Sequence, residues 1–260
     1  MREGDRRVTS GQLSFGLIVV GDEILNGRRQ DRHFAVIGGL LRERGYRLAW
    51  LRILPDDPAY LSTEFARTMA EGLPVFCCGG IGATPDDHTR AAAAAAANVA
   101  LTLHPGAVAE IEARFGDAAY PHRVKMAELP DGAGLIPNPY NRIPGFSIRG
   151  HYFVPGFPDM AHPMVAWVLD QHYAAGGIKE AQRSVRIFGI TESGLMDLME
   201  ELVSAYPDAK FFSLPRLGAE FQIEMGFRGG GSLEAPYQAL ISGLAVRKVR
   251  FEPVADPDSD

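Results

Sequence analysis

The fold is decided by the stretch Pro74-Val-Phe-Cys-Cys-Gly-Gly-Ile-Gly-Ala-Thr-Pro-Asp-Asp-His-Thr89. Its first five residues are apolar, which predicts a strand buried on both faces of a parallel sheet. The glycines after it predict a tight turn at the carboxyl end of that strand, and the alanine run over 91–97 predicts a helix. This order of strand, glycine-rich loop and helix is typical of an open α/β sheet with right-handed crossovers.

Two more units of strand and helix precede this stretch. The apolar run 15–20 ends at Gly21 and predicts a buried strand, and apolar residues at helical spacing predict a helix over 34–44. Residues 46–53 alternate as a second strand, and the turn at 55–58 begins the next helix. The sequence therefore repeats one βα pattern three times.

The rest of the sequence predicts further elements of this domain, followed by a second, smaller domain. We expect a helix over 107–115, an extended loop over 121–144, a strand over 150–156, a helix over 158–172 and a linker over 176–184. Strands at 184–190, 211–214, 221–227 and 245–251, with helices at 195–205 and 234–244, predict a small α+β domain over 182–252. Residues 1–12 are expected to be disordered, and 253–260 form an acidic tail.

Composition excludes several functions. The chain has 260 residues with 26 basic and 32 acidic side chains, and its net charge of -6 argues against a nucleic-acid partner. No apolar stretch approaches the ~20 residues that span a bilayer, so no membrane partner is expected. The polar residues 1–12 argue against a secretory signal and predict a cytoplasmic protein. The two cysteines, Cys77 and Cys78, would point to opposite faces of a strand, as core residues rather than as a disulfide or zinc site.

The glycine-rich loop is the strongest candidate site. In a doubly wound sheet, ligands bind at the carboxyl ends of strands, and the amides of Gly79, Gly80, Ile81 and Gly82 suit a phosphate. Thr84 is expected either to bind the ligand or to cap a helix that starts at Pro85, with Asp87 completing a capping box. The adjacent carboxylates of Asp86 and Asp87 repel each other, which favours a divalent metal of the Mg or Co type.

A second candidate loop follows the first strand. Gly21, Asp22 and Glu23 are expected to bind a ligand hydroxyl or base. Asp31 is expected either to cap the next helix or to face the site as a second carboxylate. His33 and His88 are candidates for acid or base groups, or for ordinary surface residues at helix starts.

These segments carry a resemblance. Gly21-Asp-Glu-Ile-Leu-Asn-Gly27 with Asp31, then the loop 79–89, then Asn138-Pro and Pro144-Gly-Phe, then Val154-Pro-Gly-Phe-Pro-Asp-Met160, resemble the molybdopterin-binding MoaB/Mog fold in one consistent order over 13–173. Within that fold the likeness is to the amino-terminal domain of the CinA (competence/damage-inducible protein A) family. The small domain, which opens with Gly189-Ile-Thr-Glu-Ser193, is similar to the CinA middle domain.

The resemblance implies a three-layer sandwich with a mostly parallel sheet over 13–175, a homo-oligomer, and molybdopterin or a nucleotide as ligand. It implies that Asp87 and Asp31 match acidic residues of relatives that split ADP-ribose or FAD pyrophosphates with a divalent metal. Arg123 and Lys125 would offset charge on the leaving phosphate, and Gly156 would border the ligand. Because the chain ends before an amidohydrolase-like domain, deamidation of nicotinamide mononucleotide is not expected.

The sequence also departs from the CinA pattern. Arg32-His33 stand where those relatives usually have Thr-Asn, and the segment His122-Arg123-Val124-Lys125 stands for their Asn-Arg-Lys-Gln. Three functions therefore stay open: a metal-dependent nucleotide pyrophosphatase, a non-catalytic pterin- or nucleotide-binding module, and a molybdopterin adenylyltransferase-like activity.

Overall fold

The computed structural model describes residues 13–216 and 221–255. The chain divides into two compact units, one ending at Gly177 and the other starting at Ile178. Residues 1–12 and 256–260, for which disorder and an acidic tail were expected, lie outside the described residues.

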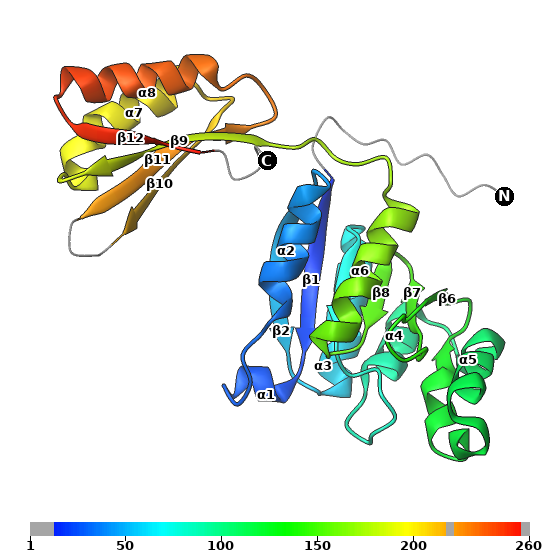
Figure 1. Cartoon of the computed structure of the whole chain (residues 1–260). Helices are drawn as coiled ribbons and strands as arrows, with labels where there is room; N and C mark the ends of the chain where they lie inside the picture. Colours follow the sequence, from blue (N-terminus) through cyan, green and yellow to red (C-terminus); the bar gives the residue numbers. More distant parts are fainter. Residues whose placement is uncertain (1–12, 217–220, 256–260) are drawn as a thin grey trace. The chain divides into compact units, whose positions relative to one another are not determined.

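The first unit is built on a six-stranded sheet with the strand order β2-β1-β3-β8-β7-β6 (Figure 1). Its first four strands are parallel, and β7 and β6 run antiparallel to their neighbours. This confirms the mostly parallel sheet. The strands are β1 (Ser14–Val20), β2 (Arg47–Leu54), β3 (Val75–Cys78), β6 (Gly134–Ile136), β7 (Gly145–Ile148) and β8 (His151–Val154).

Helices cover both faces of this sheet and make the three layers. On one face, Phe65 of α3 and Ile111 of α5 share an apolar cluster with Cys77. On the other face, Ile37 of α2 and Val165 of α6 share a second cluster with Cys78. The helices are α2 (His33–Glu43), α3 (Pro58–Glu71), α4 (Thr89–Ala97), α5 (Pro105–Phe115) and α6 (Pro158–His172).

Both cysteines are core residues, as predicted. Each thiol is fully buried, and burial raises the pKa of both above the usual range of a cysteine. They therefore stay protonated and act as small apolar side chains of β3, one toward each helical layer.

The prediction of an extended loop over 121–144 is wrong. This segment holds the 3-10 helix η2 (Arg123–Ala127), the strand β5 (Glu128–Pro130), which pairs with β4 (Leu101–Leu103), and β6 at the sheet edge. Strands of three residues are too short for an alternating pattern to outweigh the proline, glycine and asparagine around them. Two further short elements are α1 (Asp22–Leu25) and η1 (Gly116–Ala119).

The second unit has its own antiparallel sheet and core. The strand order is β10-β11-β9-β12, and Val185, Ile187 and Phe227 of the sheet pack with Leu198 and Leu240 of two helices. Its elements are β9 (Ala181–Phe188), η3 (Glu192–Leu195), α7 (Met196–Ala205), β10 (Lys210–Arg216), β11 (Gln222–Gly229), α8 (Glu234–Val246) and β12 (Arg250–Val254).

Two boundaries in this unit differ from the prediction. The strand expected at 245–251 begins only at Arg250, because α8 continues to Val246 and a turn with Lys248 at a φ of 55° follows. A short apolar run does not distinguish a helix end from a strand. The linker expected over 176–184 ends earlier, because β9 starts at Ala181.

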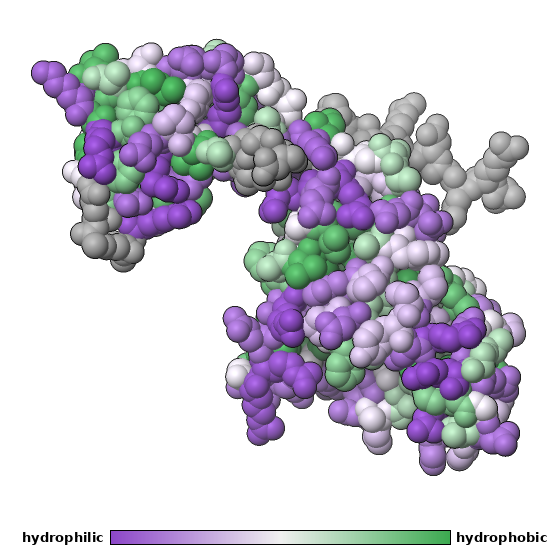
Figure 2. Space-filling model, in the orientation of Figure 1, coloured by the Kyte–Doolittle hydropathy of each residue, from purple (hydrophilic) through white to green (hydrophobic). Residues whose placement is uncertain are grey.

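Figure 2 shows mainly hydrophilic side chains on the face of the first unit that it presents. Within the described ranges, no helix combines the length and the apolar character needed to cross a membrane.

Candidate functional site

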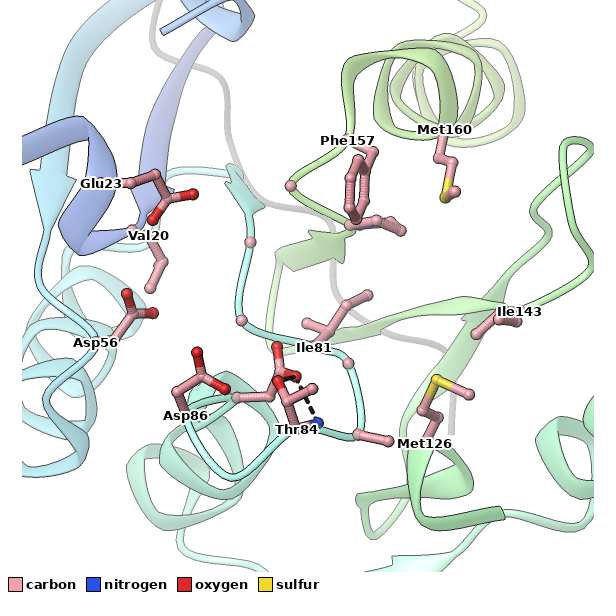
Figure 3. A pocket seen from close by; sticks show the side chains of 18 of the residues that line it. Val20, Glu23, Asp56, Ile81, Thr84, Asp86, Met126, Ile143, Phe157 and Met160 are labelled. Atoms are coloured by element: carbon pink, nitrogen blue, oxygen red, sulfur yellow. Dashed lines mark hydrogen bonds between the residues drawn. The ribbon is translucent and has the colours of Figure 1, made fainter. Parts of the chain in front are cut away.

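A cleft of about 450 Å³ opens at the carboxyl edge of the parallel strands (Figure 3). Three of the segments that line it are the one after β1 with Gly21 and Glu23, the glycine-rich loop 79–87 after β3, and residues 155–157 between β8 and α6. Parallel strands that end at one edge bring these loops together, as the sequence predicted for the glycine-bearing loops. Gly156 also packs against Gly79, since a Cβ on Gly156 would lie 3.3 Å from the Cα of Gly79.

The glycine-rich loop depends on its first two glycines. Gly79 has a φ of 112° and Gly80 a φ of 68°, in the left-handed region that favours glycine. A Cβ on Gly79 would also overlap the carbonyl oxygen of Val20, and one on Gly80 would overlap the hydroxyl of Thr89. Among the hydrogen bonds of the described residues, none is donated by the amides of Ile81, Gly82 or Ala83. All three residues line the cleft, whereas the amide of Gly79, also expected to bind a phosphate, donates to the carbonyl of Val154 over 3.0 Å.

Thr84 does not cap a helix, which corrects one of its two predicted roles. α4 begins at Thr89, whose amide donates to the carbonyl of Gly80 over 3.0 Å. The amide of Thr84 donates to Oδ2 of Asp87 over 2.8 Å, and its hydroxyl donates to the same oxygen. Asp87 therefore closes a turn that shapes the loop through its Oδ2, and no hydrogen bond among the described residues involves its Oδ1.

The cleft is acidic on one side and apolar on the other. In Figure 3, Glu23, Asp56 and Asp86 lie on one side, and Met126, Ile143 and Met160 lie on the other. Four carboxylates line the cleft, from Glu23, Asp56, Asp86 and Asp87, and Arg29 is the one cationic side chain among its described lining residues. Nη1 of Arg29 lies 3.5 Å from Oε1 of Glu23.

Asp56 was missed by the sequence analysis. It follows β2, and its Oδ2 accepts the amide of Asp22 over 2.9 Å while its own amide donates to Oδ1 of Asp22. Burial raises the pKa of the Asp56 carboxyl, and the charges of Asp22, Glu23 and Asp86 raise it further. The signal was present, since the turn 55–58 follows a strand that neighbours β1 and ends at the same edge.

Arg90 was also missed, and it holds the glycine-rich loop in place. It is buried in the first turn of α4, and its Nη2 donates to the carbonyl of Gly82 over 2.8 Å. Its Nη1 donates to the carbonyls of Lys125 and Glu128. Burial lowers the pKa of this guanidinium. The negative charges of Glu128 and Asp87 raise the pKa and partly offset that effect. No sequence pattern marks an arginine before an alanine run as a loop anchor.

Arg123 and Lys125 are not brought into the cleft. The guanidinium of Arg123 donates to the carbonyl of Ala118 over 2.6 Å and lies 4.7 Å from the ring centre of Phe115. Lys125 is exposed, and its backbone carbonyl accepts a hydrogen bond from Arg90. Neither residue lines the cleft in the structure, whereas Arg29 does.

Asp31 serves the helix start, one of its two expected roles. Its two carboxylate oxygens accept the amides of His33 and Phe34, both over 3.0 Å, at the first turn of α2. Asp31 lines a second cleft of about 330 Å³ rather than the first. His88 directly precedes α4 without a side-chain cap.

The side chain of His33, at the start of α2, contacts the loop before α6. Its ring is buried, and Nε2 lies 3.2 Å from the carbonyl oxygen of Gly156. Burial lowers the pKa of His33, with the hydrogen bond to Gly156 and the charge of Asp31 acting against that shift. A neutral imidazole that donates to a carbonyl is a structural link, so His33 is not positioned as an exposed acid or base group.

Residues 16–173 match the family model of a probable molybdopterin binding domain, so the chain belongs to that family. A CinA-like protein of Geobacter sp. (strain M21) is 32% identical over 199 residues, which cover 72% of this chain and 47% of that protein. A protein of Aeropyrum pernix is 31% identical over 251 residues, which cover 90% of this chain and 91% of its own length.

Among solved structures, CinA from Thermoplasma acidophilum, described as a protein with unknown function, has a TM-score of 0.55 and 29% identity. The alignment covers 60% of this chain and 96% of that one. This chain spans about half the length of the CinA-like relatives that it matches. The expected fold and its likeness to CinA are confirmed.

Proposed function

We propose that this protein is a divalent-metal-dependent pyrophosphatase of ADP-ribose or FAD. The observation that carries the proposal is the cleft itself, which is lined by several carboxylates and by three loop residues whose amides have no acceptor among the described residues. The amides suit a phosphate, whereas the carboxylates repel one. A divalent cation between them would resolve this conflict.

The residues fit such a cation in part. The described residues contain no group of three or more acidic, histidine or cysteine side chains arranged to hold a metal. Mg²⁺ commonly binds through one or two carboxylates together with phosphate oxygens of the substrate. Asp86 and Oδ1 of Asp87 would supply the carboxylates, and hard oxygen ligands of this kind suit Mg²⁺ or Co²⁺.

In the proposed reaction, water attacks one phosphorus of the pyrophosphate and the bond from that phosphorus to the bridging oxygen breaks. Two monophosphates form, AMP and ribose 5-phosphate from ADP-ribose. The amides of Ile81, Gly82 and Ala83 would hold one phosphate, and Arg29 would approach the other. The cation, when bound, would neutralise charge on the phosphates and activate the water.

The test is hydrolysis of ADP-ribose, FAD and NAD by the purified chain, with Mg²⁺ or Co²⁺ and after chelation by EDTA, with AMP measured by chromatography. We expect AMP from at least one substrate with the metal, and none after chelation. Absence of AMP with every substrate and either metal, from protein that is folded by circular dichroism, would refute the pyrophosphatase proposal.

A non-catalytic binding module is the second candidate. It is favoured by the bonds of Asp87 to Thr84 and of Asp31 to the start of α2, which give both carboxylates a structural task. Calorimetric titration with AMP separates the two proposals. A pyrophosphatase of the proposed kind should bind AMP more tightly with Mg²⁺, and a simple module should bind it equally well in EDTA.

A further inference from the structure

We propose that the ring of Phe157 is a stacking platform for a planar heteroaromatic ring of the ligand, such as a nucleobase, flavin or pterin. This inference rests on the proposed function, because it assumes that the phosphates of the same ligand lie on the glycine-rich loop. The ring would extend from the first cleft into the second cleft, the one lined by Asp31.

The two clefts share one wall. Val20, Glu23, Arg29, Gly156 and Phe157 line both of them. Their volumes are about 450 and 330 Å³, which together suit a ligand larger than a mononucleotide. A pyrophosphate compound has two substituted halves, and the two adjoining clefts offer one space for each, with the glycine-rich loop in the first cleft.

Phe157 has no structural task that explains its side chain. It stands at the N-cap of α6, where the side-chain oxygen of Ser, Thr, Asp or Asn would accept a hydrogen bond from a helix amide, and it makes no side-chain cap. Phe157 is 60% exposed and belongs to neither apolar cluster of the first unit. In Figure 3 its ring points from the start of α6 toward the cleft.

The surroundings of this ring suit stacking. The lining of the second cleft includes the apolar residues Val19, Val20 and Cys78 and the polar residues Gln30 and Arg32. An exposed aromatic ring and apolar lining residues bind the faces of a planar ring, while polar residues can bond its edge. Arg29 lies in both clefts and can contact the phosphate that joins the two parts.

The test compares AMP with ribose 5-phosphate, which differ in the adenine ring and contain no pyrophosphate bond to be hydrolysed. Calorimetric titration of the full chain with Mg²⁺ should show tighter binding of AMP. Phe157→Leu should weaken AMP binding by about 5-fold to 150-fold, the range of aromatic stacking on a base, and leave ribose 5-phosphate unchanged. Phe157→Tyr should retain AMP binding, and so should Phe34→Leu, which alters an exposed phenylalanine that lines neither cleft.

Flavin mononucleotide serves as a second ring in the same titration. The inference is overturned if Phe157→Leu weakens both ligands equally, or if neither AMP nor flavin mononucleotide binds more tightly than ribose 5-phosphate. Its failure is separable from that of the proposed function. If binding depends on the ring of the ligand but no hydrolysis occurs, the pyrophosphatase proposal is refuted and the stacking role of Phe157 stands. If hydrolysis occurs and Phe157→Leu does not change it, the pyrophosphatase proposal stands and the stacking role is refuted.

Discussion

Replacing Asp87 with asparagine is expected to lower the rate of ADP-ribose hydrolysis by about 100-fold or more, the equivalent of roughly 3 kcal/mol of transition-state stabilisation. The amide oxygen of asparagine can still accept the hydrogen bonds from Thr84, so the turn of residues 84–87 should persist. The variant loses the negative charge that the proposed cation needs. The effect should therefore appear in turnover and cation dependence, and the melting temperature should stay close to that of the natural chain.

Asp131→Asn is the matched control, because Asp131 is an exposed carboxylate after β5 that lines neither cleft. It should leave turnover unchanged. Retained turnover in Asp87→Asn would exclude Asp87 as a cation ligand and leave it as the residue that closes the turn. A variant that loses turnover because it is unfolded would show itself in the melting curve.

Lowering the pH from about 7.5 to about 4.5 is expected to destabilise the first unit, with His151 contributing about 2 to 3 kcal/mol of that loss. His151 is fully buried at the start of β8, and Nε2 lies 2.7 Å from Oγ1 of Thr68. Burial lowers its pKa from 6.5 to about 4, against a smaller upward effect of the Arg149 carbonyl. The unfolded chain therefore takes up the proton first. The stability from the neutral ring is complete above about pH 6.5 and is lost as the pH falls toward 4.

Urea denaturation followed by tryptophan fluorescence measures this effect in the full chain. Trp50 and Trp167 are the only two tryptophans of the sequence, and both lie in the first unit. In His151→Gln, which cannot be protonated, the loss of unfolding free energy between the two pH values should be smaller by the amount given above. His122→Gln alters an exposed histidine and should behave as the natural chain. Equal pH dependence in His151→Gln and the natural chain would contradict the assignment.

The parallel sheet was predictable because the sequence pattern of two of its strands is clear. Residues 15–20 and 74–78 are unbroken apolar runs that end at glycines, and such runs are typical of strands covered on both faces. The positions of Cys77 and Cys78 on opposite faces follow from strand geometry alone. The glycine-rich loop could be placed at the carboxyl edge for the same reason.

The local geometry of the site was not predictable, because it depends on contacts between distant segments. Thr84-Pro85 has the pattern of a helix start, yet the bonds of Thr84 to Asp87 and of Thr89 to Gly80 delay the helix to Thr89. Asp56 accepts the amide of Asp22, and Arg90 reaches carbonyls of residues 125 and 128. Sequence spacing carries no information on these tertiary contacts.

A phosphate held by the loop amides is tested most directly by nuclear magnetic resonance of the ¹⁵N-labelled full chain, titrated with AMP and Mg²⁺. We predict that the largest amide shifts fall on Ile81, Gly82 and Ala83, whose N–H groups have no acceptor among the described residues. Ribose 5-phosphate should shift the same three amides, because it carries the same phosphate. Shifts confined to the second unit, or a loop whose resonances stay unchanged while the ligand binds, would contradict the site.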